Sequence, residues 1–140
     1  DTDQIRAVAA GLCDIAIVNH YYLARLMESD DSEDQEVVDT VAMHFPSQEV
    51  GGTHVNISGA GVAANAPNEE NAIRFIEYLA SEDAQELYAI ANNEFPVQEE
   101  MQLPMVLEQF GEFDSDNINV SVYGTNNPLA IRVMDRAGWR

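Results

Sequence analysis

Two adjacent tyrosines, Tyr21 and Tyr22, follow Asn19 and His20 directly after a short apolar run. Neighbouring residues at the start of a helix point about 100° apart, so both phenols can reach one point in a cleft. A phenol has a pKa of about 10 and gives up its proton at neutral pH only beside a strong positive charge. Paired phenolates therefore suit a hard trivalent cation such as Fe(III) better than Zn(II) or Ca(II). A structural role for both rings stays open, with one of them packed on the helix behind.

Other residue types that carry chemistry lack a partner at the required spacing. The three histidines, His20, His44 and His54, form no HxH or HxxxH pair, and we expect structural roles for them. Cys13 lies within the apolar run and is expected to be buried. No serine stands in a nucleophile-elbow sequence, and the glycines at 59 and 61 lack the third glycine and the basic residue of a phosphate-binding loop. These patterns do not indicate an enzyme.

The elements around the tyrosines have the pattern of a strand followed by a helix. Residues 12–18 (LCDIAIV) are apolar and rich in β-branched residues, which favours a strand buried on both faces. Asn19 is a good N-cap for a helix from His20 to about Met27. A strand and a helix joined by a short turn are typical of α/β proteins, in which ligands bind at the carboxyl ends of strands.

The rest of the chain shows further strand and helix patterns. Strands are expected at 41–45 and 53–64, and helices at 69–80, at 82–91 after the N-cap Ser81, at 104–110, and from Asn126 toward the end. Residues 28–36 hold six carboxylates in nine positions (ESDDSEDQE). They lack the ligand spacing and the central glycine of an EF-hand calcium loop, so we expect a solvated, mobile loop.

The composition bounds the class of protein. The chain has 140 residues, with 25 acidic against six basic residues and a net charge of −19, so polyanions such as nucleic acid and anionic membranes are excluded as generic partners. A hydrophobic fraction of 46% excludes a wholly disordered acidic tail. No apolar run approaches the ~20 residues of a transmembrane helix. The chain shows no signal peptide and opens inside a helical pattern over residues 5–9, which predicts a missing N-terminal part.

Four separated motifs stand in one order along nearly the whole chain: DIAIVNHYYLARL, VAMHFP, GGTHVNISGAGVAANAPNEENAIRFIEYLASEDAQELYAIANNEFPV and AIRVMDRAGW. With these motifs the chain resembles the ferric-iron-binding periplasmic proteins of ABC importers, which have the α/β type II periplasmic-binding-protein fold. The resemblance implies that Tyr21 and Tyr22 are iron ligands and that Asn19 helps to hold the anion or water completing the coordination sphere. It also implies periplasmic capture of Fe(III), with a synergistic anion such as carbonate, and delivery to the membrane subunits of an ABC permease.

Proteins of that family are well over twice this length, so the resemblance implies that the chain is a C-terminal portion of a two-lobed fold. Residues 1–50 are then a second-lobe segment with the tandem tyrosines, residues 51–97 return to the first lobe, and residues 98–140 form a C-terminal helical segment that packs on the second lobe. The remaining iron ligands and the signal peptide are expected in the missing N-terminal part of the same protein. A fragment of this kind exposes apolar faces and is expected to be capable of self-association.

Two other functions stay open from the sequence. The chain could belong to a binding protein for an organic solute or anion, with Tyr21 and Tyr22 stacking on the ligand. It could also be an acidic interaction domain that binds no metal and whose tyrosines are structural. A ligand-dependent thermal shift separates the three hypotheses, because a tight ligand raises the unfolding temperature.

Overall fold

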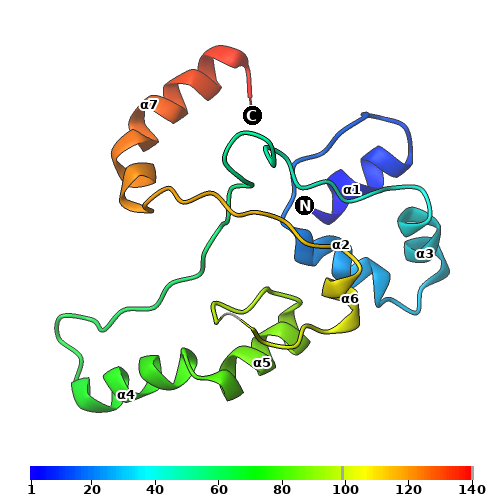
Figure 1. Cartoon of the computed structure of the whole chain (residues 1–140). Coiled ribbons are helices and arrows are strands. Elements are labelled where there is room, and N and C mark those ends of the chain that lie inside the picture. The colour runs from blue at the N-terminus through cyan, green and yellow to red at the C-terminus, as the bar shows by residue number, and fades with distance from the viewer. Residues whose placement is uncertain (99, 140) are drawn as a thin grey trace. The chain divides into compact units, whose positions relative to one another are not determined.

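The computed structural model describes residues 1–98 and 100–139 of the chain (Figure 1). The helices are α1 (Thr2–Ala9), α2 (His20–Met27), α3 (Ser32–Val38), α4 (Glu69–Leu79), α5 (Glu82–Asn92), α6 (Met105–Glu108) and α7 (Ser121–Ala137). Within the described residues the only β-pairing is one isolated parallel bridge between Thr53 and Ser115.

The chain divides into two compact units. The first comprises Asp1–His44 and Ile57–Glu112 and contains α1 to α6; the second comprises Phe45–Asn56 and Phe113–Arg140 and contains α7. The assignment of three chain segments to the lobes of a larger fold, with boundaries after residues 50 and 97, stays a prediction.

Most of the predicted helices are confirmed, and local caps explain where they begin and end. Asn19 precedes α2 in the extended backbone conformation of an N-cap residue, although its side chain makes no capping hydrogen bond. The Ser81 hydroxyl accepts a hydrogen bond from the backbone N–H of Ala84 at 3.4 Å and so starts α5. Gly11 follows α1 with φ +70°, a conformation that glycine adopts readily after a helix.

Helix α3 occupies a stretch that was expected to be a mobile loop, so that expectation is wrong. The Asp31 carboxylate accepts a hydrogen bond from the Glu33 N–H at 2.9 Å, and acidic residues in the first turn suit the positive end of the helix dipole. Asp34 then accepts hydrogen bonds from Arg6 of α1 and from the Ser29 hydroxyl, each at 2.7 Å. These carboxylates therefore cap and anchor a helix instead of holding a loop open.

Replacement of Asp34 by asparagine is expected to lower the free energy of unfolding modestly at neutral pH and to leave it unchanged at low pH. The hydrogen bonds from Arg6 and Ser29 lower the pKa of Asp34 below its usual value. Its contribution is therefore present above the pKa of the unfolded chain, about 3.9, and is lost as pH falls through the folded pKa. Urea unfolding at pH 7 and below pH 3 measures the difference, with Asp30→Asn as the control of equal charge. A loss of equal size at both pH values would contradict the assignment.

The strands predicted at 12–18, 41–45 and 53–64 are not formed as paired strands, and this part of the expectation is wrong. A strand requires a neighbour that accepts and donates its backbone hydrogen bonds, and among the described residues only Thr53 finds such a bridge. The residues Leu12, Ile17 and Ile15 are 80, 81 and 82% exposed, respectively. The apolar run before the tyrosines is therefore open to solvent instead of being buried on both faces.

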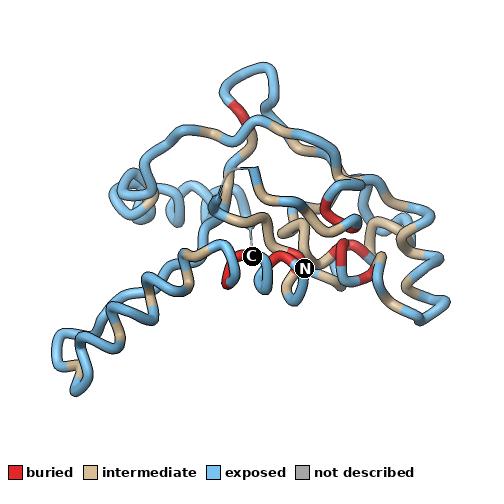
Figure 2. The backbone as a smooth tube through the Cα atoms, turned by 60° about the horizontal axis from the view of Figure 1, so that its bottom comes forward, coloured by how far each residue is buried: buried red, intermediate tan, exposed pale blue. Residues whose placement is uncertain are grey.

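The buried core of the first unit forms around α2. One cluster contains Ile5, Leu23 and Leu26, and a second contains Ala24, Val106 and Leu107. Because α2 contributes residues to both clusters, it is held against α1 and α6 at once. Figure 2 shows that buried residues are confined to a few short segments of the chain.

Many large apolar side chains lie at the surface of the helices outside this core. Phe75 on α4, Leu87 on α5 and Ile131 on α7 are 60, 59 and 50% exposed. Apolar surface of this kind is typical of faces that contact other protein. It agrees with the expected capacity for self-association, which stays a prediction.

In the second unit, the loop over residues 45–56 is joined to residues 113–116 by hydrogen bonds. The Thr53 N–H donates to the Asp114 carbonyl at 2.7 Å, and the Asp116 N–H donates to the Thr53 carbonyl at 2.9 Å. The Gln48 side chain donates to the Asp114 carbonyl at 3.0 Å and accepts from the Asp114 N–H at 2.7 Å. These bonds fix the two backbone segments side by side.

Helix α7 begins at Ser121, earlier than the start at Asn126 that was expected from the sequence. The Asn119 side chain accepts hydrogen bonds from both the Ser121 N–H (3.0 Å) and the Ser121 hydroxyl (2.8 Å), which starts the helix. Pro128 consequently lies inside the helix, where it lacks the N–H that would bond to Gly124. The sequence predicts a later start because proline is common at first helical positions.

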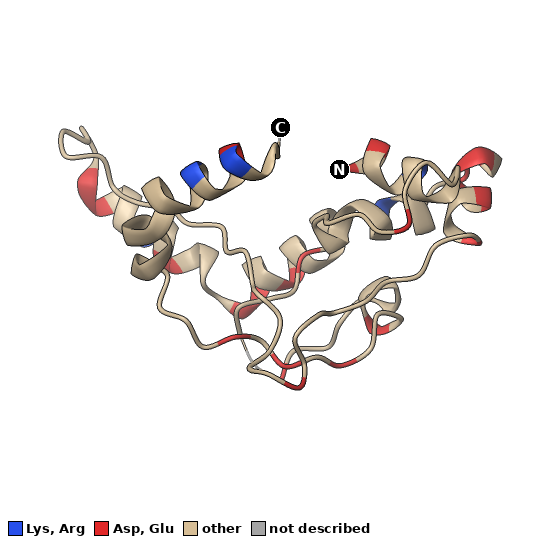
Figure 3. Cartoon of the chain, turned by 90° about the horizontal axis from the view of Figure 1, so that it is seen from above, with Lys and Arg blue, Asp and Glu red and all other residues tan. Residues whose placement is uncertain are grey.

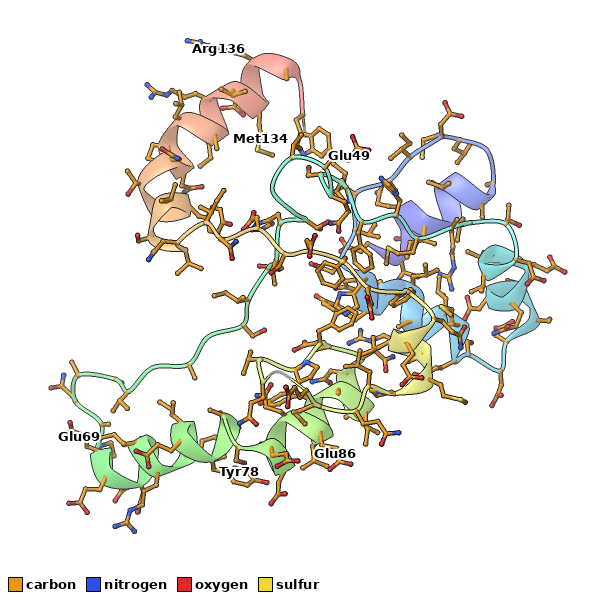
Figure 4. The ribbon with its side chains drawn as sticks, in the orientation of Figure 1. Glu49, Glu69, Tyr78, Glu86, Met134 and Arg136 are labelled. Carbon is orange, nitrogen blue, oxygen red and sulfur yellow. The ribbon has the colours of Figure 1, made fainter. Side chains whose placement is uncertain are left out.

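Most of the 25 acidic residues belong to the first unit, whereas helix α7 of the second unit carries arginines as well (Figure 3). Glu69 on α4, Glu86 on α5 and Arg136 on α7 extend from the surfaces of their helices (Figure 4). None of the helices in the described ranges combines the length and the apolar character that crossing a membrane requires.

Candidate metal centre

The candidate site lies at the start of α2, where the sequence places Asn19, Tyr21 and Tyr22. Asn19 is the N-cap residue, and both its backbone N–H and its side-chain amide donate to one carboxylate oxygen of Asp1, at 3.0 and 3.3 Å. These bonds tie the start of α2 to the start of α1. A role of Asn19 in holding an anion stays a prediction.

The rings of Tyr21 and Tyr22 lie side by side. Their centroids are 4.6 Å apart and the ring planes are inclined by 36°. The Arg25 guanidinium lies 5.3 Å from the centroid of Tyr21 and 5.4 Å from that of Tyr22, so one cation contacts both π-systems. Tyr22 also packs against the cluster of Ile5, Leu23 and Leu26, which anchors its ring.

The environment of Tyr21 keeps its phenol protonated in the absence of a metal. Burial, a hydrogen bond with Tyr22 and the negative charge of Glu94 raise the pKa of Tyr21 above its ordinary value, and the positive charge of Arg25 only partly opposes them. A cation that binds here must therefore displace the proton.

His20 is the first residue of α2 and has a structural environment. Its Nε2–H donates to the Asn93 carbonyl at 2.8 Å, since a carbonyl can only accept. Burial lowers the pKa of His20, and the hydrogen bond to Asn93 offsets part of that shift. The ring packs on Phe95 with centroids 4.8 Å apart and against Phe110 at 6.1 Å. This arrangement agrees with the structural role expected for His20.

The remaining candidate residues lie elsewhere. His44 is exposed, and His54 belongs to the second unit, where its Nδ1 lies 3.0 Å from the Tyr123 hydroxyl and 3.6 Å from a carboxylate oxygen of Asp116. Cys13 is exposed, so its expected burial is wrong, because the apolar run around it is not covered by paired strands. Within the described ranges, no three His, Cys, Asp or Glu side chains converge as metal ligands.

Two residues near the tyrosines were missed from the sequence. Arg25 follows Tyr21 by four positions and Tyr22 by three, and this spacing alone places it on their face of the helix. Glu94, whose charge acts on Tyr21, lies two residues after the end of α5 and carries no local signal.

Comparison with known proteins gives matches along the entire chain. The chain is 51% identical over 142 residues to Iron uptake protein A2 of Synechocystis, a match that covers 100% of the chain and 41% of that protein. A solved Trichodesmium protein in complex with iron and citrate is 56% identical with a TM-score of 0.95, covering 100% of the chain and 44% of that structure. The apo form of FutA2 from Synechocystis is 51% identical with a TM-score of 0.93, covering 100% and 45%. No protein-family model matches the chain.

The chain thus spans less than half of the length of the relatives that it matches. Although the described residues form no sheet of their own, their backbone follows that of proteins with the α/β type II periplasmic-binding-protein fold, which confirms the expected fold class. The resemblance read from the sequence is confirmed with it: along its whole length, the chain is similar to a part of proteins that are named for iron uptake or ferric-iron binding.

Proposed function

We propose that the chain is part of a periplasmic solute-binding protein that captures Fe(III) through the phenolates of Tyr21 and Tyr22. The observation that carries the proposal is the pairing of the two rings at the start of α2, with centroids 4.6 Å apart. It is supported by the relative of 56% identity that was solved with iron and citrate. The proposal includes delivery of the ion to an ABC permease, as the resemblance to the ferric-iron-binding proteins implies. It is capture without catalysis.

The donor set suits Fe(III) as cargo. Two phenolates bring two negative charges to a trivalent ion, and hard oxygen ligands favour a hard cation. Two ligands leave positions of an octahedral ion open, so further ligands must come from outside this pair. In the proposal they come from other residues of a protein of the relatives' length and from an anion such as carbonate.

Asn19 is the residue that would help to hold that anion in the proposed site. It lies at the N-terminus of α2, where backbone N–H groups and the helix dipole favour negative charge. Its side-chain amide donates to Asp1 at 3.3 Å. The amide nitrogen has two N–H donors, so in the proposed site the anion contacts this group either beside the Asp1 carboxylate or in its place.

Fe(III) affinity is expected to rise with pH, by about two log units per pH unit where both phenols are protonated in the free protein, because each ligand gives up one proton. The raised pKa of Tyr21 extends this range upward. Competition against a chelator of known protonation constants, between about pH 5 and 8, measures the slope. A slope near zero would exclude phenolate ligation.

The two alternative functions predict different effects of Fe(III) on the unfolding temperature of the protein. A receptor for an organic solute or anion is stabilised against heat by that solute and is not stabilised by Fe(III). An acidic interaction domain is stabilised by neither. Only the proposed function predicts a rise in unfolding temperature with Fe(III).

A further inference from the structure

Asn93 ends helix α5 in an unusual backbone conformation. Its φ and ψ of 59° and 36° are left-handed, which asparagine tolerates better than most residues other than glycine. The residue is only 3% exposed. A buried asparagine makes its hydrogen bonds mainly with other protein groups, so its contacts define what it does.

Asn93 contacts both ends of helix α2. Its carbonyl accepts the hydrogen bond from His20, the first residue of α2, at 2.8 Å. Its side-chain Nδ2 donates at 2.9 Å to a carboxylate oxygen of Glu28, the C-cap residue of α2. The helix between these contacts is about 12 Å long. One buried residue thus fixes the near and the far end of the helix that carries both tyrosines.

The contact at the near end leads directly to the tyrosine pair. The His20 ring meets the Tyr21 ring edge to face, with centroids 5.7 Å apart and planes inclined by 76°. The Tyr21 ring in turn lies against Tyr22. A shift of His20 therefore displaces Tyr21. The Asn93 Oδ1 atom has no hydrogen-bond partner among the described residues, so the carbonyl and the Nδ2 donor are the groups through which Asn93 acts.

We propose that Asn93 is a positioning residue for the iron site: by holding both ends of α2, it sets the orientation in which Tyr21 and Tyr22 present their oxygens to one ion. This inference rests on the proposed function. Tyr21 and Tyr22 share one helix and move with it, and in the proposed function the other ligands come from outside this helix. All of the ligands can therefore reach one ion only when the helix is held in one orientation relative to the rest of the site. Groups that orient the ligands of a metal typically change its affinity by roughly 10- to 100-fold when they are removed.

The test exchanges the two partners of the Asn93–Glu28 bond in a protein that carries this chain at the relatives' full length. Asn93→Asp alone sets two carboxylates against each other, and Fe(III) affinity is expected to fall about tenfold or more. Glu28→Gln alone keeps an acceptor oxygen and is expected to change affinity little. The double variant Asn93→Asp, Glu28→Gln reverses the donor and the acceptor at unchanged net charge. It is expected to recover the affinity to within about twofold of the original, since one hydrogen bond replaces another.

Two further variants separate positioning from charge and from folding. Asn92→Asp adds the same charge one residue earlier and is expected to leave affinity unchanged. Asn93→Gly keeps the left-handed backbone and the carbonyl but deletes the donor, and it serves where Asn93→Asp does not fold. Iron-free thermal unfolding establishes which variants are folded. The readouts are chelator competition and the position of the visible phenolate-to-Fe(III) band, which reports ligand geometry and not stability.

Weakened binding with a shifted band in Asn93→Asp or Asn93→Gly, and recovery in the double variant, support the positioning role. Wild-type affinity and band in both Asn93 variants, or a failure of the exchange to restore binding, overturn it. If the unsubstituted protein itself shows no phenolate band with Fe(III), the proposed function fails and this inference fails with it. The two failures are therefore distinguished by the unsubstituted protein.

Discussion

Replacement of both Tyr21 and Tyr22 by phenylalanine is expected to abolish the visible absorption band of the Fe(III)-loaded protein and to weaken Fe(III) binding by at least about 10²- to 10⁴-fold. The band arises from charge transfer between phenolate oxygen and Fe(III), and phenylalanine has no such oxygen. Loss of one group that only orients a ligand costs roughly 10- to 100-fold, and loss of two direct ligands costs at least the product of two such losses.

The double substitution is conservative for the fold, so a loss of the band or of affinity reports the loss of ligands and not unfolding. Phenylalanine keeps both rings, so the stacking of Arg25 and the packing of Tyr22 on the core persist. Iron-free thermal unfolding should therefore change little. Tyr78→Phe on α4 is the matched control, since it removes a phenol from the surface of another helix (Figure 4). An unchanged band in the double variant would rule out these tyrosines as ligands.

Gly52→Ala is expected to destabilise the second unit by roughly 2–4 kcal/mol. Gly52 has φ +95°, and a Cβ there would lie 2.5 Å from the carbonyl carbon of Ser115 and 2.7 Å from the carbonyl oxygen of Asp114. These are backbone atoms, which cannot rotate away as a side chain can. Relief of the clash would pull apart the segments joined by the Thr53 and Asp114 hydrogen bond. Hydrogen exchange at the Thr53 and Asp116 amides measures the loss, together with chemical denaturation.

Gly51 supplies the control for this experiment. Its φ of +124° is equally unsuited to a side chain, but no atom lies within 4 Å of the position that its Cβ would take. Gly51→Ala therefore introduces the backbone strain without the clash. It is expected to lower the free energy of unfolding by about 1–3 kcal/mol less than Gly52→Ala does. Equal effects of the two alanines would show that strain alone decides the cost and that the close approach is unimportant.

Helices could be predicted from the sequence wherever the starting signal is local. Asn19 and Ser81 each stand directly before an apolar helical period, and α2 and α5 begin after them. Helix α3 could not be predicted in this way, because its density of charge outweighed the capping signal of Asp31. Its anchoring partner, Arg6, is also far away in the sequence. The prediction of strands is wrong for a related reason. Residues 12–18 show an apolar pattern, but a strand forms only with a partner strand, and the local pattern does not indicate where that partner is.

The residues of the candidate site also fall into those that local sequence predicts and those that it does not. The pairing of Tyr21 with Tyr22 follows from adjacency on one helix, and Arg25 could have been placed beside them by helical spacing. Asn93 and Glu94 could not, because they reach α2 from the end of a helix that begins at Glu82. No periodicity within either helix indicates that they meet. Ligands can thus be predicted from local pattern, whereas the residues that hold them in place depend on tertiary packing.

The exposed thiol of Cys13 makes the site observable without altering it. The chain has one cysteine and no lysine, so a thiol-reactive nitroxide would label a single position. Tyr21 follows eight residues later, so the backbone of the labelled residue lies no more than about 29 Å from that of Tyr21. An unpaired electron at that range relaxes faster beside paramagnetic Fe(III). Occupancy of the ion could then be followed by electron spin relaxation while both phenols, Asn19 and Arg25 remain untouched.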